Sequence, residues 1–226
     1  MTENQPGHIG IILDGNRRFA KKLLLEPWRG HELGAGKIEK LFSWCSELGI
    51  MEITLYCFSL ENFDRPEKEK NFLMNLFKRE FKKYLNEEKI MDRGIKVRVI
   101  GEMGRFDSEL QELMKKVEKK TAGNSEFIFN FCMAYGGRQE IIDAVKKMVE
   151  SNLPISEENL KKNLWISGEP ELIIRTGGEK RTSNFLMWQS AYSEWVFLDK
   201  TWPEFEREDL IECVDEFKKR ERRFGR

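Results

Sequence analysis

The order of two apolar patterns along the chain constrains its fold more than any other feature. Segments whose apolar residues recur at helical spacing alternate with short, nearly continuous apolar runs, which are typical of buried strands. The runs occupy residues 8–13, 53–58, 95–101, 126–133, 172–174 and 195–198. This alternation predicts an α/β fold, a mostly parallel β-sheet with helices on both faces. The 226 residues contain no repeat and no Pro/Gly/Ser-rich linker, so we expect one domain over residues 1–226.

The spacing of apolar residues also predicts which side chains the helices bury. A helix over residues 31–48, ending before Gly49, would bury Leu33, Ile38, Leu41, Phe42 and Cys45. A helix starting after Pro66 would bury Leu73, Leu76, Phe77, Phe81 and Tyr84. The later helices would bury Phe106, Leu110, Leu113, Met114 and Val117, then Ile141, Ile142, Val145, Met148 and Val149, and last Leu210, Val214 and Phe217.

Composition narrows the class of protein. Lys and Arg number 39, as do Asp and Glu, so no net positive field favours nucleic acid as a partner. The N-terminal residues lack the pattern of a signal peptide, and no apolar stretch reaches the ~18 residues of a membrane span. The four cysteines are scattered, which predicts reduced thiols rather than disulfides or a structural zinc site. We therefore expect a cytoplasmic protein.

Polar clusters follow three of the predicted strands. They begin at Asp14, Ser59 and Arg175, and ligands of parallel sheets bind at the carboxyl ends of strands. The turn Asp-Gly-Asn can direct backbone N–H groups toward an anion, and arginines bind phosphate in bidentate fashion. A carboxylate such as Asp14 belongs in a phosphate site only if a cation bridges them, and Mg²⁺ is the usual bridge. An isolated Asp-Gly-Asn is more often a plain turn, but three clusters together favour a diphosphate site without identifying the substrate.

Six segments resemble, in order and spacing, those of undecaprenyl diphosphate synthase and its cis-prenyltransferase relatives. They are HIGIILDGNRRFAKK, GHELGA, ITLYCFSLENFDRP, AYGGRQEI, IRTGGEKRTSNFLMWQSAYSEW and RERRFG, within residues 8–225. The segment EPWRGHELGAGK is more similar to archaeal members. The resemblance implies the undecaprenyl diphosphate synthase-like fold and a Mg²⁺-dependent transferase. Such an enzyme condenses isopentenyl diphosphate with an allylic primer, farnesyl or geranylgeranyl diphosphate.

The resemblance also implies a role for each matching residue. Asp14 would hold Mg²⁺ and assist departure of the allylic diphosphate, and His31 would donate a hydrogen bond or proton to it. Glu194 would be a second Mg²⁺ ligand. The residues that would grip the allylic diphosphate are Gly15, Asn16 and Arg18, together with Arg17 and Phe19 of the same segment. The residues of a mobile loop that orders isopentenyl diphosphate are Ser59, Glu61, Asn62, Phe63 and Arg65. The residues that would bind isopentenyl diphosphate are Arg175, Arg181 and Ser183. The residues of a C-terminal signature that reaches the partner subunit of a homodimer are Arg223 and Gly225.

Some positions depart from the family pattern. Pro27 replaces a common arginine, and Arg29 could reach the same phosphate instead. Arg17 replaces a glycine, and Lys180 replaces a histidine near the metal. Tryptophans are replaced at Phe19 and Phe63.

Several alternatives stay open in the sequence. The proton acceptor could be Ser59 acting through water or a diphosphate oxygen, because Asn62 is not a strong base. The aromatic face of strand 126–133 could be plain core or the wall of a chain tunnel. A short-chain or irregular prenyl coupler would share these motifs. A non-catalytic subunit of a two-component transferase would have lost the Asp-Gly-Asn and arginine motifs. A lipid product also implies transient contact with a membrane surface.

Overall fold

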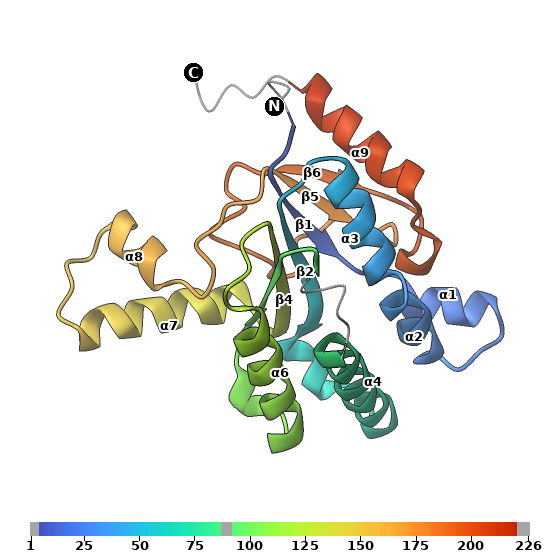
Figure 1. Cartoon of the computed structure of the whole chain (residues 1–226), viewed down its shortest axis with the longest axis horizontal. Helices are drawn as coiled ribbons and strands as arrows, with labels where there is room; N and C mark the ends of the chain where they lie inside the picture. The colour runs from blue at the N-terminus through green and yellow to red at the C-terminus, as the bar shows by residue number, and fades with distance from the viewer. Residues whose placement is uncertain (1–4, 87–91, 221–226) are drawn as a thin grey trace.

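The computed structural model describes residues 5–86 and 92–220 and contains a parallel β-sheet (Figure 1). Across the sheet the strands lie in the order β3-β4-β2-β1-β5-β6, and every neighbouring pair runs parallel. Their bounds are β1 His8–Ile12, β2 Glu52–Ser59, β3 Ile95–Ile100, β4 Phe127–Tyr135, β5 Leu172–Arg175 and β6 Glu194–Phe197. The predicted parallel α/β fold is therefore confirmed.

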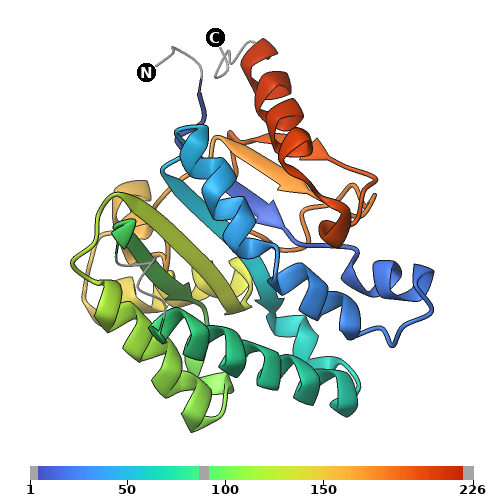
Figure 2. The ribbon, with the colours of Figure 1, turned by 45° about the vertical axis from the view of Figure 1, so that its right-hand side comes forward.

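Helices cover the two faces of the sheet unequally. Figures 1 and 2 show α3, α4, α6 and α9 on one side, and their apolar residues join strand side chains in one large core. A smaller cluster on the other face includes Ile166, Phe185 and Leu186, which come from connecting segments rather than helices. Helices α7 and α8 lie on this other side, so the prediction of a sheet flanked by helices is confirmed. Among the described helices, none is both long and apolar enough to cross a bilayer.

The helices have the following bounds. The α-helices are α1 Asn16–Lys22, α2 Arg29–Ala35, α3 Ile38–Glu47, α4 Glu67–Asn86, α6 Ser108–Thr121, α7 Gly137–Glu150, α8 Glu157–Asn163 and α9 Arg207–Lys219. The 3₁₀ turns are η1 Leu60–Asp64, η2 Met103–Arg105 and η3 Trp202–Glu204.

The helix expected over residues 31–48 is two helices, and this corrects the prediction. The break falls between α2 and α3, where the buried Lys37 ammonium donates to the carbonyl of Phe205 at 2.6 Å. Helix α2 packs through its glycines, because a Cβ on Gly30 would lie 1.9 Å from the carbonyl oxygen of Asn16. The opposite side of α2 faces solvent, so Leu33 is 46% exposed instead of buried.

The apolar stripe predicted for α7 is only partly right, because Met148 is buried and Ile141 half-buried but the other three residues are not. Ile142, Val145 and Val149 are 49%, 40% and 63% exposed. The buried side of α7 carries Glu140, whose carboxylate accepts hydrogen bonds from the Tyr135 hydroxyl and from the backbone N–H of Ile166. This buried polar network, with Ala144 and Met148 on the same side of α7, leaves Ile142, Val145 and Val149 pointing outward.

Candidate active site

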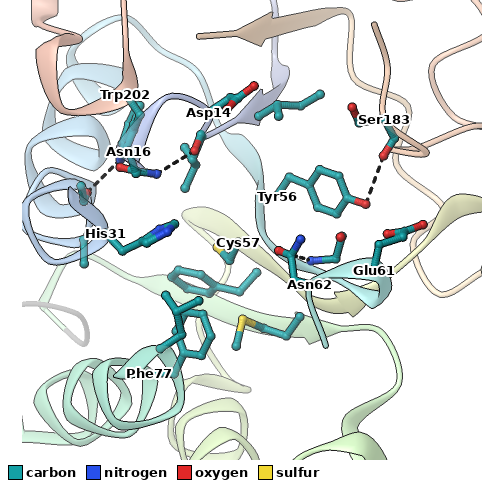
Figure 3. Close-up of a pocket in the computed structure, with 18 of the residues that line it drawn as sticks. Asp14, Asn16, His31, Tyr56, Cys57, Glu61, Asn62, Phe77, Ser183 and Trp202 are labelled. Atoms are coloured by element: carbon teal, nitrogen blue, oxygen red, sulfur yellow. Dashed lines mark hydrogen bonds between the residues drawn. The ribbon is translucent and has the colours of Figure 1, made fainter. Parts of the chain in front are cut away.

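A cavity of about 710 Å³ opens beyond the carboxyl ends of β1, β2 and β5 (Figure 3). This is the edge of the sheet at which the three polar clusters were expected to meet. Ten of the predicted site residues line the cavity: Asp14, Asn16, His31, Ser59, Glu61, Asn62, Arg65, Arg175, Arg181 and Ser183. The fold thus gathers residues from distant parts of the chain around one space.

Asp14 and two arginines form the charged centre of this site. The Asp14 carboxylate lies 2.9 Å from Nη2 of Arg175 and 3.2 Å from Nη2 of Arg18. Its side chain keeps 28% of its surface exposed, whereas that of Arg175 keeps 4%. A carboxylate between two guanidinium groups can exchange one of these contacts for a metal ion when an anionic substrate arrives.

The turn after β1 depends on glycine. Gly15 has φ 97°, and a Cβ there would lie 2.7 Å from the Cβ of Thr201. Gly177, with φ 90°, approaches Asp14 so closely that its Cβ would lie 3.0 Å from the Asp14 carbonyl carbon. The approach at Gly177 holds the loop after β5 against the turn after β1, and the approach at Gly15 packs the same turn against the segment that follows β6. Asp14 and Arg175 are thereby brought into contact.

Arg175 also organises the loop that follows β5. Its Nη1 donates to the Ser183 hydroxyl at 2.7 Å and to the carbonyl of Arg181. Ser183 and Asn184 have φ values of 50° and 63°, in the left-handed region, which is unfavourable for these residues. The hydrogen bonds from Arg175 stabilise the loop in this conformation. Within the described residues, Nε of Arg175 is buried without a hydrogen-bond partner, which leaves one donor for a ligand.

Ser59–Asp64 forms a capped turn above the cavity. The backbone N–H of Ser59 donates to Oδ1 of Asn62 at 3.2 Å, and the Ser59 side chain caps the same turn in return. The Glu61 carboxylate accepts a contact from Nδ2 of Asn184 at 3.3 Å. The turn after β2 is therefore linked to the loop after β5, and together they enclose the polar end of the cavity.

His31 and Arg65 meet at a buried carboxylate that sequence reasoning missed. Glu69 of α4 is 3% exposed and lies 3.7 Å from Nε2 of His31 and 3.2 Å from Nη1 of Arg65. Burial lowers the pKa of His31 below 6.5, although Glu69 acts in the opposite direction. The pKa of Glu69 is lowered, chiefly by His31 and then by the arginines beside it. The cluster therefore contains a neutral imidazole next to an ionised carboxylate at neutral pH.

Two further residues shape the site without having been predicted. The Tyr56 hydroxyl donates to the carbonyl of Ser183 at 3.2 Å (Figure 3). The ring of Tyr56 also stacks on Phe185, with centroids 4.8 Å apart. Oδ1 of Asn184 accepts from the backbone N–H of Arg138 at 2.9 Å. The one available sequence signal was for Glu69, which follows Arg65 by four residues at the start of a helix.

Several predicted substrate-binding residues lie outside the cavity lining. Arg29 is exposed and pairs with Glu32 at 2.9 Å, and the ring of Phe63 packs against Phe58 and Phe106. Arg17 is exposed and lies 3.7 Å from Glu69, and Phe19 is half-buried on α1. Asn16 reaches the cavity, but its Nδ2 donates to the carbonyl of Leu13 at 2.8 Å, so its side chain holds the turn.

Glu194 lies at the other end of the sheet from Asp14. It is the first residue of β6 and is level with Leu172 of β5, whereas Arg175 at the far end of β5 contacts Asp14. Its carboxylate binds Arg220 at 2.6 Å. Asp14 and Glu194 of one chain therefore do not share a cation, which corrects the predicted pair of ligands. The predicted tail residues Arg223 and Gly225 lie outside the described residues.

The inner part of the cavity is apolar. It runs between the sheet and helices α3 and α4, along Leu73, Leu76, Phe77, Phe81 and Met133. Ile38, Tyr84 and Phe131 line both this cavity and a second one of about 260 Å³, so they form the wall between them. The rings of Tyr84 and Phe131 stack with centroids 5.7 Å apart, and Phe129 lies on the far side of this wall. Such a shape suits a ligand with a charged head and a long hydrocarbon tail.

The side chains around Asp14 determine whether the site could hold the implied Mg²⁺. The described residues contain no group of three or more His, Cys, Asp or Glu that could hold a metal alone. Mg²⁺ is commonly held by one or two carboxylates together with substrate phosphates. Asp14 lies beside Arg175 and Arg18, a residue type that commonly binds phosphate, and its carboxylate lines the cavity, so it fits such a shared ion.

Comparisons with known proteins agree with this geometry. The family model described as "Putative undecaprenyl diphosphate synthase" matches residues 12–225. The chain is 45% identical to the tritrans,polycis-undecaprenyl-diphosphate synthase (geranylgeranyl-diphosphate specific) of Methanopyrus kandleri, over 98% of this chain and 85% of that protein. It is 42% identical to an isoprenyl transferase of Thermus thermophilus, over 98% and 89%.

A solved structure of a prenyl diphosphate synthase also has the fold of this chain. The crystal structure of lavandulyl diphosphate synthase from Lavandula x intermedia, in complex with dimethylallyl diphosphate, superposes with a TM-score of 0.93 at 31% identity. The similarity covers 98% of this chain and 99% of that one. The chain belongs to the undecaprenyl diphosphate synthase family and is a cis-prenyltransferase.

Proposed function

We propose that this enzyme adds isopentenyl diphosphate units to geranylgeranyl diphosphate, making a long cis-polyprenyl diphosphate. The observation that carries the proposal is the joining of two environments in one cavity. Asp14, Arg175 and Ser183 form a polar end, and an apolar part of the same cavity continues from it along α4. The polar end suits two diphosphates, and the tunnel suits the growing chain.

The charged residues would divide between the two substrates. Arg175, Ser183 and Arg181 would bind isopentenyl diphosphate, since Arg175 has a donor to spare and already orients Ser183. Asp14 would hold Mg²⁺, which neutralises negative charge on the leaving allylic diphosphate. Arg18, 3.2 Å from Asp14, would add a fixed positive charge at the same place.

The remaining polar groups would act on protons and orientation. His31, kept neutral by burial, can donate a hydrogen bond to the leaving diphosphate. After the new bond forms, a proton leaves the condensed intermediate. Ser59 acting through water, or a diphosphate oxygen, would accept it. Asn62 orients the backbone at Ser59 and has no basic group for this task.

The size of the cavity favours chain elongation over irregular coupling. Lavandulyl diphosphate synthase shares the fold, so a short branched product is the second candidate function. Ten carbons occupy roughly 300 Å³ if each takes about the 30 Å³ of a water molecule. The cavity of about 710 Å³, with another 260 Å³ behind it, has room for a longer chain. The geranylgeranyl specificity in the name of the Methanopyrus kandleri relative supports the primer.

A homodimer completes the proposal. The exposed apolar face of α7, formed by Ile142, Val145 and Val149, would be covered by a second copy. The tail residues Arg223 and Gly225 would then reach the partner's site.

The chain retains Asp14 and the site arginines, so it has the machinery to act without a catalytic partner. The lipid product would pass to a membrane by transient contact with its surface.

Product analysis tests the proposal. Purified enzyme with Mg²⁺ and labelled isopentenyl diphosphate would receive dimethylallyl, geranyl, farnesyl or geranylgeranyl diphosphate in turn, and products would be measured by mass spectrometry. We expect a ladder of C5 steps that starts most efficiently from geranylgeranyl diphosphate. A single C10 product from dimethylallyl diphosphate would instead support the irregular coupler. No product with any primer would reject both.

A further inference from the structure

The connection between α1 and α2 exposes three consecutive leucines. Leu23, Leu24 and Leu25 are 51%, 95% and 45% exposed, and Figure 1 shows the segment at the edge of the molecule. Large apolar side chains gathered on a protruding tip indicate an interaction site more often than isolated ones do.

The backbone holds the leucines outward on a fixed turn. The N–H groups of all three leucines donate to carbonyls of α1, at distances of 2.9–3.2 Å. Leu24 has φ 56°, a left-handed conformation that helix ends usually give to glycine. A branched apolar residue in this conformation is unfavourable for the isolated chain, and the turn leaves the side chain of Leu24 95% exposed.

Lysines directly precede the leucines, whereas the arginines of the same segment pair with carboxylates, Arg17 with Glu69, Arg18 with Asp14 and Arg29 with Glu32. Residues 17–29 contain one carboxylate, Glu26, and five cations, whereas the whole chain has a formal net charge of 0. The five are Arg17, Arg18, Lys21, Lys22 and Arg29. Lys21 and Lys22 directly precede the leucines and are exposed, although Lys22 also contacts Glu204 at 3.1 Å. Apolar side chains next to lysines match the interface of a bilayer that carries anionic lipids.

We propose that the segment Leu23–Leu25 inserts into the interfacial layer of an anionic membrane. Lys21 and Lys22 lie against the headgroups. The choice of a lipid partner rests on the proposed function, because the product of that reaction is itself a lipid. The segment lies near the active site, since α1 starts one residue after Gly15 and α2 carries His31. A protein partner is disfavoured by size, because a stable interface buries about 800 Å² on each side and three leucines at a tip supply much less.

Vesicle flotation tests this surface directly. Vesicles of phosphatidylcholine, with or without about a third of phosphatidylglycerol, would be mixed with the substrate-free protein. We expect binding to the anionic vesicles, and a loss of about tenfold or more in the triple variant Leu23→Ser, Leu24→Ser, Leu25→Ser. The double variant Lys21→Ser, Lys22→Ser should lose several-fold on anionic vesicles only. Ile155→Ser, which removes a side chain 86% exposed elsewhere, is the matched control and should bind as the wild type does.

Three outcomes would overturn the inference. They are absence of wild-type binding, equal binding by the triple leucine variant, and a change in oligomeric state caused by that variant in analytical ultracentrifugation. The last result would assign the leucines to a second copy of the chain. The binding assay contains no substrate, so it succeeds or fails independently of the reaction proposed above. Condensation with primer in detergent should be the same for the triple variant and the wild type, because these leucines lie outside the site.

Discussion

Oδ2 of Asp14 accepts a hydrogen bond of 2.9 Å from Nη2 of Arg175, and this contact joins the ends of β1 and β5. It connects the residue proposed to hold Mg²⁺ with the residue proposed to bind isopentenyl diphosphate. Since β1 and β5 are adjacent in the sheet, the contact holds the ends of the two strands together, and under the proposed function it would set the separation of the two diphosphates. Preorganised charges of this kind stabilise a transition state without moving during the reaction.

Arg175→Lys should weaken the use of isopentenyl diphosphate. A lysine keeps the charge but loses the fork that contacts Asp14 and Ser183 together. We expect kcat/KM for isopentenyl diphosphate to fall by about 10²-fold, from the loss of charge-assisted hydrogen bonds. Arg29→Lys is the matched control, because Arg29 pairs with Glu32 outside the cavity. Equal losses in steady-state kinetics would show that Arg29 binds the substrate and would contradict the assignment.

Stability should fall as the pH drops below about 6.5, the ordinary pKa of histidine. Burial lowers the pKa of His8 and of His31, so the unfolded chain binds protons that the folded chain does not. The free energy of unfolding is therefore highest above pH 6.5 and decreases toward pH 5. Urea unfolding at a series of pH values measures this slope. The double variant His8→Gln, His31→Gln should have a shallower slope in this window, and an unchanged slope would contradict the account.

Product length should depend on the wall between the two cavities. Phe131→Ala would join them, and Phe129→Ala would enlarge the second, so both should lengthen the C5 ladder seen by mass spectrometry. If these side chains were only core, each variant would lose about 3–5 kcal/mol of stability with an unchanged ladder. Phe131→Leu keeps more volume and guards against unfolding. Phe106→Ala, a buried aromatic outside both linings, is the control for packing alone.

Mixed dimers would show whether the C-terminal tail of one chain contributes to the active site of its partner. Asp14→Asn and Arg223→Ala should each be nearly inactive as homodimers. After unfolding together and refolding, half of the dimers would be mixed. One site in each mixed dimer would have an intact Asp14 and an intact partner tail. About a quarter of all sites should then recover. If native mass spectrometry shows mixed dimers and no activity returns, the tail acts within its own chain.

The sequence predicted those features that depend on strand ends. The carboxyl ends of adjacent parallel strands must meet, so the proximity of Asp14, Ser59 and Arg175 followed from the order of elements. Glu69 was missed because its role depends on α4 lying beside α2, a packing that apolar spacing does not specify. Glu194 was expected beside Asp14, although it starts its strand instead of following one.

The helix errors have a common physical cause. Apolar spacing assumes that a helix packs through its largest apolar residues. Helix α2 instead packs through Gly30 and Gly34, which permit close backbone approach, and α7 packs through the hydrogen bonds of Glu140. In both helices a specific local contact overrides the average preference for burying apolar side chains. The apolar residues displaced from the core, such as Val149, lie on the surface proposed for a second copy.

The rate of the chemical step in Asp14→Asn tests the central claim most directly. Asparagine keeps the size of the side chain and can still accept a hydrogen bond from Arg175, but it lacks the charge that holds Mg²⁺. Single-turnover measurement with saturating substrates and Mg²⁺ should show a rate about 10²–10³-fold below that of the wild type. The affinity for isopentenyl diphosphate and the melting temperature should stay close to the wild-type values. A wild-type rate in this variant would contradict the account.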